Sequence, residues 1–147
     1  MLKQFTLNQS GRDFCVGDIH GYFSVLQHKL KTLNFNVNHD RLFAVGDLVD
    51  RGPESDRAQE FLKYPWFHSV RGNHEQMVID FKVGDERTVK ENGGEWFLRL
   101  NDREKHILTL RFFEGKTQME VAEEIGISQA QVSRLEKAAL SHMRKHI

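Results

Sequence analysis

Short apolar runs alternate with amphipathic stretches before residue 100 of the chain. Each apolar run is followed by a polar turn and then by apolar residues at helical spacing. The runs and stretches predict strands at residues 14–16, 42–45 and 67–70 and helices near 22–33, 55–63 and 75–82. Strands and helices that alternate at this interval favour parallel pairing through right-handed crossovers. We therefore expect an α/β fold of the order βαβαβ in this region of the chain.

Beyond residue 100 the apolar positions recur at helical spacing only. Asn101 and Glu104 have the spacing of a capping box, which predicts that a helix begins there. This helix is expected to end at Glu114–Lys116, and two more are expected at about 117–125 and 129–143. The sequence thus predicts an all-α domain after the α/β region.

The last two predicted helices have the spacing of a helix-turn-helix. Gly126 stands at the turn, Ser128 is placed to cap the second helix, and Ala122 is small where the two helices would approach closely. The outer side of the second helix offers groups that could contact base edges or phosphates of DNA, namely Gln129, Ala130, Gln131, Ser133, Arg134 and Lys137. Spacing alone leaves a second interpretation open, an interaction bundle with a solvated, glutamine-rich face.

The charge and the cysteine content exclude some classes of protein. The 21 basic and 21 acidic residues give a formal net charge of zero, which argues against a generic polyanion binder. Cys15 is the one cysteine, so an internal disulfide is excluded and a reducing compartment is expected. Because no apolar run approaches the length of a membrane span and the N-terminus lacks the apolar region of a signal peptide, we expect a cytoplasmic protein with no membrane partner.

Polar residues follow each of the three predicted strands. Asp18, Asp47 and Asn73 lie about one βα unit apart, and His20 stands in the first turn. Ligands of open parallel sheets bind outside the carboxyl ends of the strands, so these side chains could share one crevice. Two carboxylates, an imidazole and an amide oxygen suit Mn, Fe or Zn, which would activate water there.

Three more polar residues extend this set. The planar guanidinium of Arg51 could hold a phosphate, and the imidazole of His74, supported by the carboxylate of Asp50, could donate a proton. A metal, a phosphate clamp and an acid together indicate phosphoester hydrolysis, although any single turn could instead be a solvated turn with an Asx cap. Glycines would let the backbone turn sharply beside the metal, at positions 17, 21, 46, 52 and 72.

The motifs GDIHG, GDLVDRGPES and RGNHE occur in this order and at these intervals. The set resembles the signature of the PPP-type serine/threonine metallophosphatases, and GNHEQMVID and NGGEWF resemble the bacteriophage lambda-type and bacterial phosphatases in particular. The resemblance covers roughly residues 10–98. It implies part of a metallophosphoesterase sandwich with a two-metal site in which Mn²⁺ is preferred over Fe or Zn. The implied ligands are Asp18, His20, Asp47 and Asn73, with Asp47 bridging the two ions.

The resemblance further implies the catalytic groups. Arg51 would bind the phosphoryl group, and His74, oriented by Asp50, would protonate the leaving oxygen. Metal-activated water would hydrolyse a phosphoprotein or a small phosphomonoester.

The sequence departs from these phosphatases beyond residue 98. In the family the second metal also takes two histidines from later strands, and a second phosphate-binding arginine lies in the same region. The later histidines of this chain lie in helical sequence and are not assigned as ligands: His106, His142 and His146. We therefore expect an incomplete two-metal site, impaired activity and a sheet with one uncovered face.

From about Leu100 onward the sequence resembles region 4 of bacterial sigma factors, nearest the sporulation sigma-G type. Such a domain binds the promoter −35 element and the flap of RNA polymerase, so promoter DNA and the polymerase are the implied partners. Two unrelated resemblances that meet within a few residues indicate a chimera. We expect a truncated metallophosphatase-like α/β segment at 1–98 and a sigma region 4-like helix-turn-helix at 99–147, with 83–95 as the one loop longer than a turn.

Three functions remain open. The first is an impaired metal-dependent phosphatase, and the second is a module that binds promoter −35 DNA or RNA polymerase. The third is an inactive scaffold, in which the helices would pack on the sheet in place of the missing layer.

Overall fold

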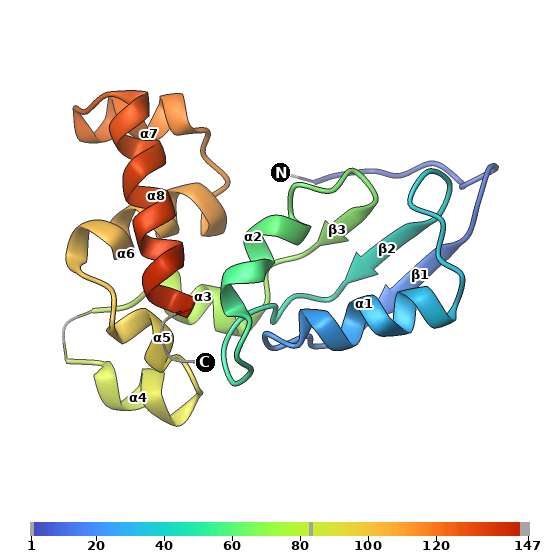
Figure 1. Ribbon diagram of the computed structural model, residues 1–147, viewed down its shortest axis with the longest axis horizontal. Helices are drawn as coiled ribbons and strands as arrows, with labels where there is room; N and C mark the ends of the chain where they lie inside the picture. Colours follow the sequence, from blue (N-terminus) through green and yellow to red (C-terminus); the bar gives the residue numbers. More distant parts are fainter. Residues whose placement is uncertain (1, 83, 145–147) are drawn as a thin grey trace.

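A parallel sheet of three strands forms the N-terminal region of the fold (Figure 1). The strands are β1 (Asp13–Val16), β2 (Arg41–Ala44) and β3 (Phe67–Ser69), hydrogen-bonded in the order β1-β2-β3. In the register Cys15 lies opposite Phe43, and Phe43 lies opposite His68. The computed structural model describes residues 2–82 and 84–144, and within them the expected parallel βαβαβ order is present.

Helices connect and follow the strands. They are α1 (Phe23–Thr32), the 3₁₀ turn η1 (Ser55–Arg57), α2 (Ala58–Phe61), α3 (Asn73–Ile79), α4 (Glu86–Glu91) and α5 (Glu95–Leu98). The expectation of a loop at 83–95 is wrong, because α4 lies inside it and buries Val89. The helix expected at 75–82 begins earlier, since the carboxylate of Glu75 accepts a hydrogen bond from the N–H of Gly72 and caps a helix that begins at Asn73.

Helix α1 covers one face of the sheet. Its apolar residues Phe23, Leu26 and Leu30 recur at helical spacing and are all buried. They belong to the same core as Leu42 and Phe67 of the strands. Burial of an apolar side chain of this size contributes about 1.5–3 kcal/mol, so this face is a main source of stability for the α/β region.

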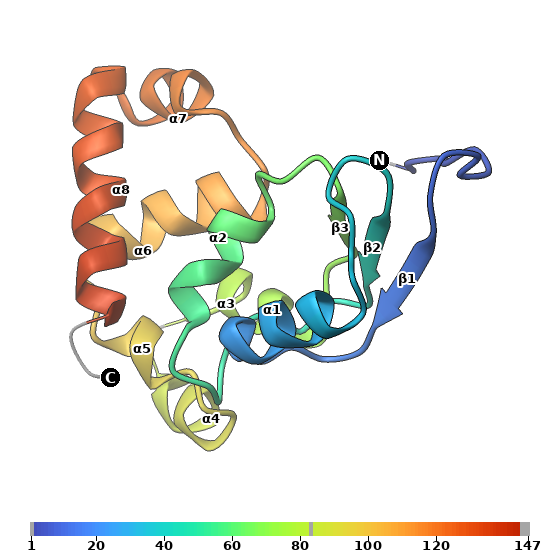
Figure 2. The ribbon, with the colours of Figure 1, turned by 45° about the vertical axis from the view of Figure 1, so that its right-hand side comes forward.

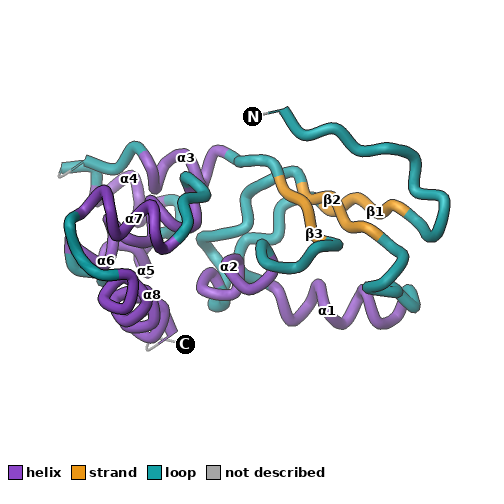
Figure 3. The backbone as a smooth tube through the Cα atoms, turned by 90° about the horizontal axis from the view of Figure 1, so that it is seen from above, coloured by secondary structure: helices purple, strands orange, loops and turns teal. Residues whose placement is uncertain are grey.

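The other face of the sheet is largely exposed. Val45 and Val70, which follow β2 and β3, keep 57% and 65% of their surface in solvent. The N-terminal segment covers some of this face, because the ring of Phe5 lies 5.0 Å from that of Phe43 and 4.5 Å from that of His68. Figure 3 shows α1 on one side of the strands and the N-terminal segment on the other. Among the described residues the sheet thus has one well-covered face, as expected.

Helical segments form the C-terminal region of the fold. They are α6 (Asp102–Leu108), the π-helical segment η2 (Thr109–Phe113), α7 (Gln118–Ile125) and α8 (Gln129–Arg144). The expected capping box is present, because the Asn101 side chain accepts from the N–H of Glu104 at 2.9 Å and the Glu104 carboxylate accepts from the N–H of Asn101 at 3.0 Å. Figure 2 shows α6 and α7 on the same side of α8. No helix in residues 2–82 and 84–144 is long and apolar enough to cross a membrane.

One apolar core joins the two regions. It includes Leu48 and Val49 beyond β2 together with Leu108 of α6 and Ala139 and Met143 of α8. A smaller cluster lies inside the helical region and gathers Ile107, Leu110, Val121, Ala122 and Val132. The helices therefore contact residues beyond the carboxyl ends of the strands and do not form a layer over the exposed face of the sheet (Figure 1).

Candidate metal centre

The polar turns meet at the carboxyl ends of the strands. The carbonyl oxygen of Asp47 accepts hydrogen bonds from the N–H groups of Ile19 and His20 at 3.1 and 2.9 Å. The carbonyl oxygen of Leu48 accepts one from Gly21 at 2.8 Å. These backbone bonds fix the first turn to the second.

The carboxylate of Glu75 joins the third turn to the second. Its oxygens accept hydrogen bonds from the N–H groups of Asp47 at 2.9 Å, Leu48 at 2.7 Å and Gly72 at 2.8 Å, and the side chain is buried. The buried charge is tolerated because these N–H donors replace water. Glu75 is absent from the predicted site, although a glutamate at the third position of a helix is half of a capping box and could have indicated it.

The backbone of the first two turns has an uncommon conformation. His20, Asp47, Asp50 and Arg51 have φ angles of +44°, +51°, +71° and +66°. Such angles cost a non-glycine residue about 1–3 kcal/mol each, so they persist where the surrounding bonds enforce them. Asn34 is the one other non-glycine residue of the described chain with a positive φ. The concentration of these angles in two turns marks this region as a candidate functional site.

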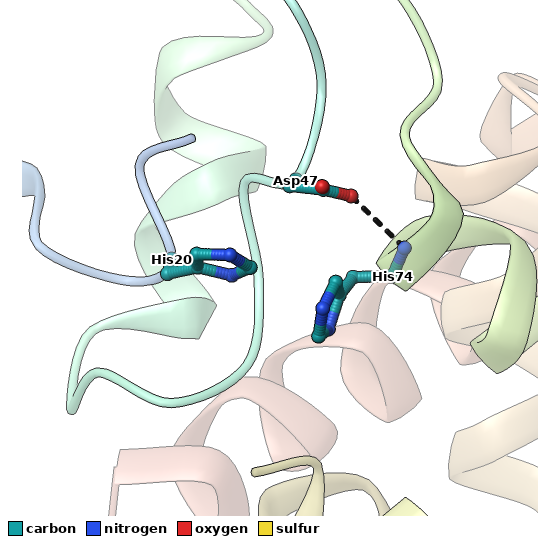
Figure 4. Close-up of side chains that lie close together, drawn as sticks. All are labelled: His20, Asp47 and His74. Atoms are coloured by element: carbon teal, nitrogen blue, oxygen red, sulfur yellow. Dashed lines mark hydrogen bonds between the residues drawn. The ribbon is translucent and has the colours of Figure 1, made fainter. Parts of the chain in front are cut away.

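His20, Asp47 and His74 form a set of metal donors (Figure 4). Their ligand atoms all lie within 4.8 Å of one another. His20 Nδ1 lies 2.9 Å from the carbonyl oxygen of Val49, which only accepts, so Nδ1 bears the hydrogen and Nε2 has a free lone pair. That Nε2 atom is buried and has no hydrogen-bond partner among the residues that the structure describes. An oriented imidazole with an unpartnered lone pair beside a carboxylate fits a divalent metal ion.

Two predicted metal ligands, Asp18 and Asn73, are exposed to solvent. The Asp18 carboxylate lies 3.6 Å from His20 Nε2. Asn73 is the first residue of α3. The structure therefore groups His20 and Asp47 with His74, which the motif assigns to acid catalysis.

His74 and Asp50 are in contact, as expected. His74 Nδ1 lies 2.8 Å from Asp50 Oδ2, and both side chains are buried. The other oxygen, Oδ1, accepts a hydrogen bond from the indole Nε1–H of Trp96 at 2.7 Å. Burial raises the pKa of Asp50, while the hydrogen bonds from His74 and Trp96 act in the opposite direction. Trp96 is absent from the predicted site, although it lies in the motif NGGEWF.

Arg51 supplies the cationic group of the site. Its backbone N–H donates to the carbonyl oxygen of Gly93 at 3.0 Å, and its Nη2 lies 3.4 Å from His74 Nε2. The residue is exposed, so the guanidinium can meet an anion beside the His74 imidazole.

Glycines permit the close approach of the turns. A Cβ on Gly72 would lie 2.1 Å from Asp47 Oδ1, and one on Gly46, whose φ is +94°, would lie 2.4 Å from the nitrogen of Gly72. Gly17 differs, because a Cβ there would meet nothing within 4 Å. The expected need for glycine is confirmed at positions 21, 46, 52 and 72 and is wrong at position 17.

The helix-turn-helix has the expected turn and cap. Gly126 has a φ of +71°, and the N–H of Gln131 donates to Ser128 Oγ at 3.2 Å. Of the predicted DNA contacts, Ser133 is half-buried and the others are exposed: Gln129, Ala130, Gln131, Arg134 and Lys137. The Gln131 side chain also accepts from the N–H of Ser128 at 2.9 Å, and Arg134 Nε donates to the carbonyl oxygen of Ala130 at 3.3 Å. Gln131 and Arg134 thus already make hydrogen bonds within the chain, to the capping residue Ser128 and to the first turn of α8 respectively.

The later histidines lie away from the metal donors. His142 Nδ1 lies 2.6 Å from the buried carboxylate of Glu104 and so joins α8 to α6. His106 is exposed on α6, and His146 lies outside the described residues. The described histidines beyond residue 98 therefore contribute no ligand to the donor set.

Two groups of known proteins are similar to this chain. It is 48% identical over 91 residues to Serine/threonine-protein phosphatase 2 of Escherichia coli (strain K12). This aligned segment covers 61% of this chain and 42% of that protein. It is 48% identical over 86 residues to Serine/threonine-protein phosphatase 1 of Salmonella typhimurium, covering 58% of this chain and 40% of that protein. The chain thus spans less than half the length of these relatives.

The second group consists of sigma factors. Residues 96–145 match the family model of sigma-70, region 4. RNA polymerase sigma-G factor of Bacillus subtilis (strain 168) is 77% identical over 71 residues, which covers 48% of this chain and 27% of that protein. Because the phosphatase match covers 61% of the chain and the sigma-G match 48%, the two similarities overlap. The chain therefore joins a segment similar to serine/threonine-protein phosphatases to a segment that matches sigma-70 region 4, as its motifs predict.

Proposed function

We propose that the α/β region is a metal-dependent phosphomonoester hydrolase whose substrate is a phosphoprotein or a small phosphomonoester. The observation that supports this most directly is the buried, unpartnered Nε2 of His20 beside Asp47 and His74. The similarity to serine/threonine-protein phosphatases agrees with this chemistry.

The metal donors would act as one group. His20 and Asp47 would hold a divalent ion, with Asp18 and Asn73 at its edge. Imidazole and carboxylate donors suit Mn²⁺, Fe or Zn, and Mn²⁺ is the ion we expect. Such an ion supplies activated water for the attack on phosphorus.

The remaining residues would bind the phosphoryl group and move a proton. Arg51 would hold the phosphoryl oxygens through its guanidinium. Asp50 holds Nδ1 of His74, so Nε2, which lies 3.4 Å from Arg51 Nη2, is the nitrogen left for proton transfer. In the doubly protonated imidazolium this Nε2 would donate its proton to the leaving oxygen. Asp50 would keep the imidazole in this orientation.

We expect turnover to be slow. Among the His, Cys, Asp and Glu side chains of residues 2–82 and 84–144, one group of three has ligand atoms close enough together to share an ion. A second ion would have few ligands among the described side chains, although two ions together would stabilise both the attacking and the leaving oxygen. We therefore include in the proposal the reduced hydrolytic activity that the sequence predicts.

Hydrolysis of p-nitrophenyl phosphate with Mn²⁺ tests this function. Asp47→Asn and His74→Asn are expected to lower kcat by about 100-fold or more, since general acid catalysis alone contributes about 10²–10⁴-fold. His28→Asn, at an exposed histidine of α1, is the matched control and should keep the wild-type rate. Equal rates of hydrolysis in the wild type and all three variants would contradict the proposal.

A second function is proposed for the helical region, the binding of promoter −35 DNA or of RNA polymerase. It is supported by the match of residues 96–145 to sigma-70 region 4 and by the exposed outer side of α8. Because basic and acidic residues balance in this chain, we expect weak DNA binding that is strongest at low salt. The proposal includes a cytoplasmic location, because the promoter DNA of a bacterial cell lies in the cytoplasm.

Gel shifts of a −35 promoter fragment at low salt test DNA binding. Arg134→Ala is expected to weaken it about tenfold, because one base contact is worth about 1–3 kcal/mol. Arg87→Ala removes an exposed arginine of α4 and should leave binding unchanged. The absence of a shift with the wild-type chain, or equal weakening in both variants, would reject DNA recognition by α8.

A further inference from the structure

Trp96 contacts the candidate site with the polar edge of its ring. Its indole Nε1–H donates to Asp50 Oδ1 at 2.7 Å, while Oδ2 of the same carboxylate lies 2.8 Å from His74 Nδ1. Trp96, Asp50 and His74 are 7%, 2% and 2% exposed, so water is largely excluded from both contacts. The carboxylate therefore has a fixed neighbour at each of its oxygens.

Both regions of the molecule hold the indole in place. Trp96 belongs to α5, and its ring packs against that of Phe97 with 5.7 Å between centroids. It shares the core with Leu108 and Met143 of the helical region. Its hydrogen bond to Asp50 joins residues that lie 46 positions apart in the sequence. The packing of the helices thus fixes the donor that faces Asp50.

We propose that Trp96 is a positioning residue for the Asp50–His74 pair. An indole N–H only donates, so it holds a carboxylate oxygen without exchanging protons with it. With Oδ1 held, rotation of the carboxylate would break both hydrogen bonds at once, so Oδ2 stays directed at His74 Nδ1. The inference rests on the proposed phosphatase function, in which Nε2 of His74 must face the leaving oxygen.

Indole N–H resonances of the ¹⁵N-labelled chain test this contact without an activity assay. The chain has two tryptophans, and Trp66 directly precedes β3, at the end of the strand remote from the site, where it stacks on Tyr64. Asp50→Asn is expected to shift the Trp96 signal upfield and leave the Trp66 signal in place, because a neutral amide accepts more weakly than a carboxylate. Movement of both signals, or of neither, would overturn the inference.

Kinetics with p-nitrophenyl phosphate and Mn²⁺ separate positioning from packing. Trp96→Phe keeps an aromatic ring and removes the donor, so kcat should fall about tenfold while KM stays within about twofold. Trp66→Phe is the matched control and should keep both constants. An unchanged kcat in Trp96→Phe, or a loss confined to KM, would contradict the positioning role.

The two measurements also separate this inference from the proposed function. If the wild-type chain hydrolyses no phosphoester while Asp50→Asn moves the Trp96 signal alone, the phosphatase proposal fails and the positioning contact is supported. If the wild-type chain is active and Trp96→Phe matches it in kcat, the positioning role fails and the phosphatase proposal is untouched.

Discussion

The helical region and the α/β region of this chain differ in how they are stabilised. In the helical region, α6, α7 and α8 each begin at a side-chain cap, from Asn101, Thr117 and Ser128 respectively. Their apolar cluster is closed around the fully buried Val132. The sheet of the α/β region, by contrast, has a largely exposed face, yet the turns beyond its strands are tightly held.

The turns are therefore ordered even though one face of their sheet is exposed. The bonds from Ile19 and His20 to Asp47 and the bonds of the Glu75 carboxylate all lie among the turns themselves. The side chains of the exposed face are not involved in them. Turn geometry thus depends on local hydrogen bonds and close glycine contacts, whereas the stability of the sheet depends on α1 and on the core shared with the helices.

Two substitutions in the apolar cores test whether the α/β region and the helical region unfold together. Phe61→Ala removes a fully buried ring of the shared core and should cost about 3–5 kcal/mol, and Ile107→Ala in the helical cluster should cost about 2–5 kcal/mol. In both variants, tryptophan fluorescence and far-UV circular dichroism should report one coincident transition, because the shared core joins the regions. Two separate transitions would show that the regions are independent.

The next effect concerns the close contact between the second and third turns. In Gly72→Ala the new Cβ would meet the Asp47 carboxylate, so unfolding should become easier by about 1–3 kcal/mol and Mn²⁺ should bind more weakly. Gly17→Ala is the matched control, because its Cβ would meet open space, and it should stay within about 0.5 kcal/mol of wild type. Urea unfolding and Mn²⁺ titration measure both quantities, and equal values for the two variants would contradict the tight packing.

An ion pair makes the stability of the α/β region depend on pH. The Asp40 carboxylate accepts hydrogen bonds from Arg12 Nη2 at 2.7 Å and from the N–H of Asn36 at 2.9 Å. Arg12 holds the pKa of Asp40 well below its usual range. The folded pKa is therefore below the unfolded value of about 3.9, so the stabilisation is complete at neutral pH and is lost as the pH falls below about 4.

Asp40→Asn tests this dependence. The difference in unfolding free energy between wild type and Asp40→Asn should be full at neutral pH and should shrink in acid. Asp80→Asn, at an exposed aspartate, is the control and should show a much flatter difference. Parallel curves for the two variants would mean that the ion pair contributes nothing specific.

The smallest effect compares the exposed sheet face with the closed helical cluster. Val45→Thr should change the unfolding free energy by less than about 0.5 kcal/mol, because Val45 is 57% exposed and the new hydroxyl would reach water. Val132→Thr places the same hydroxyl in a fully buried position and should cost about 1–3 kcal/mol. Chemical denaturation measures both, and equal losses would indicate that the sheet face is covered in solution.

Much of the fold was predictable because its signals are local. Apolar spacing locates the strands and α1, and Asn101 and Glu104 locate the start of α6. Helix α4 could not be predicted, because its six residues include a single buried side chain, Val89, which sets up no period. The π-helical turn of η2 has no signal in the residue pattern that would separate it from an α-helix.

The candidate site was predictable where motif residues bear its chemistry. His20 and Asp47 come together, as the turns predict, whereas His74, which the motif assigns to acid catalysis, lies beside them and contacts Asp50. Trp96 could not be found in this way, because its role depends on a contact with a residue 46 positions away that only the tertiary packing creates.

Binding of Mn²⁺ to the whole chain tests most directly whether these turns form a metal site. His20→Ala removes the imidazole whose Nε2 is buried without a partner among the described residues, and His28→Ala removes an exposed histidine of α1 as the matched control. Electron paramagnetic resonance should detect one bound ion per chain in wild type and in His28→Ala. Affinity should fall more than about 10- to 100-fold in His20→Ala, because the loss of a group that only supports a ligand already costs that much. Equal binding by wild type and His20→Ala, or no binding by the wild-type chain, would contradict a metal site in these turns.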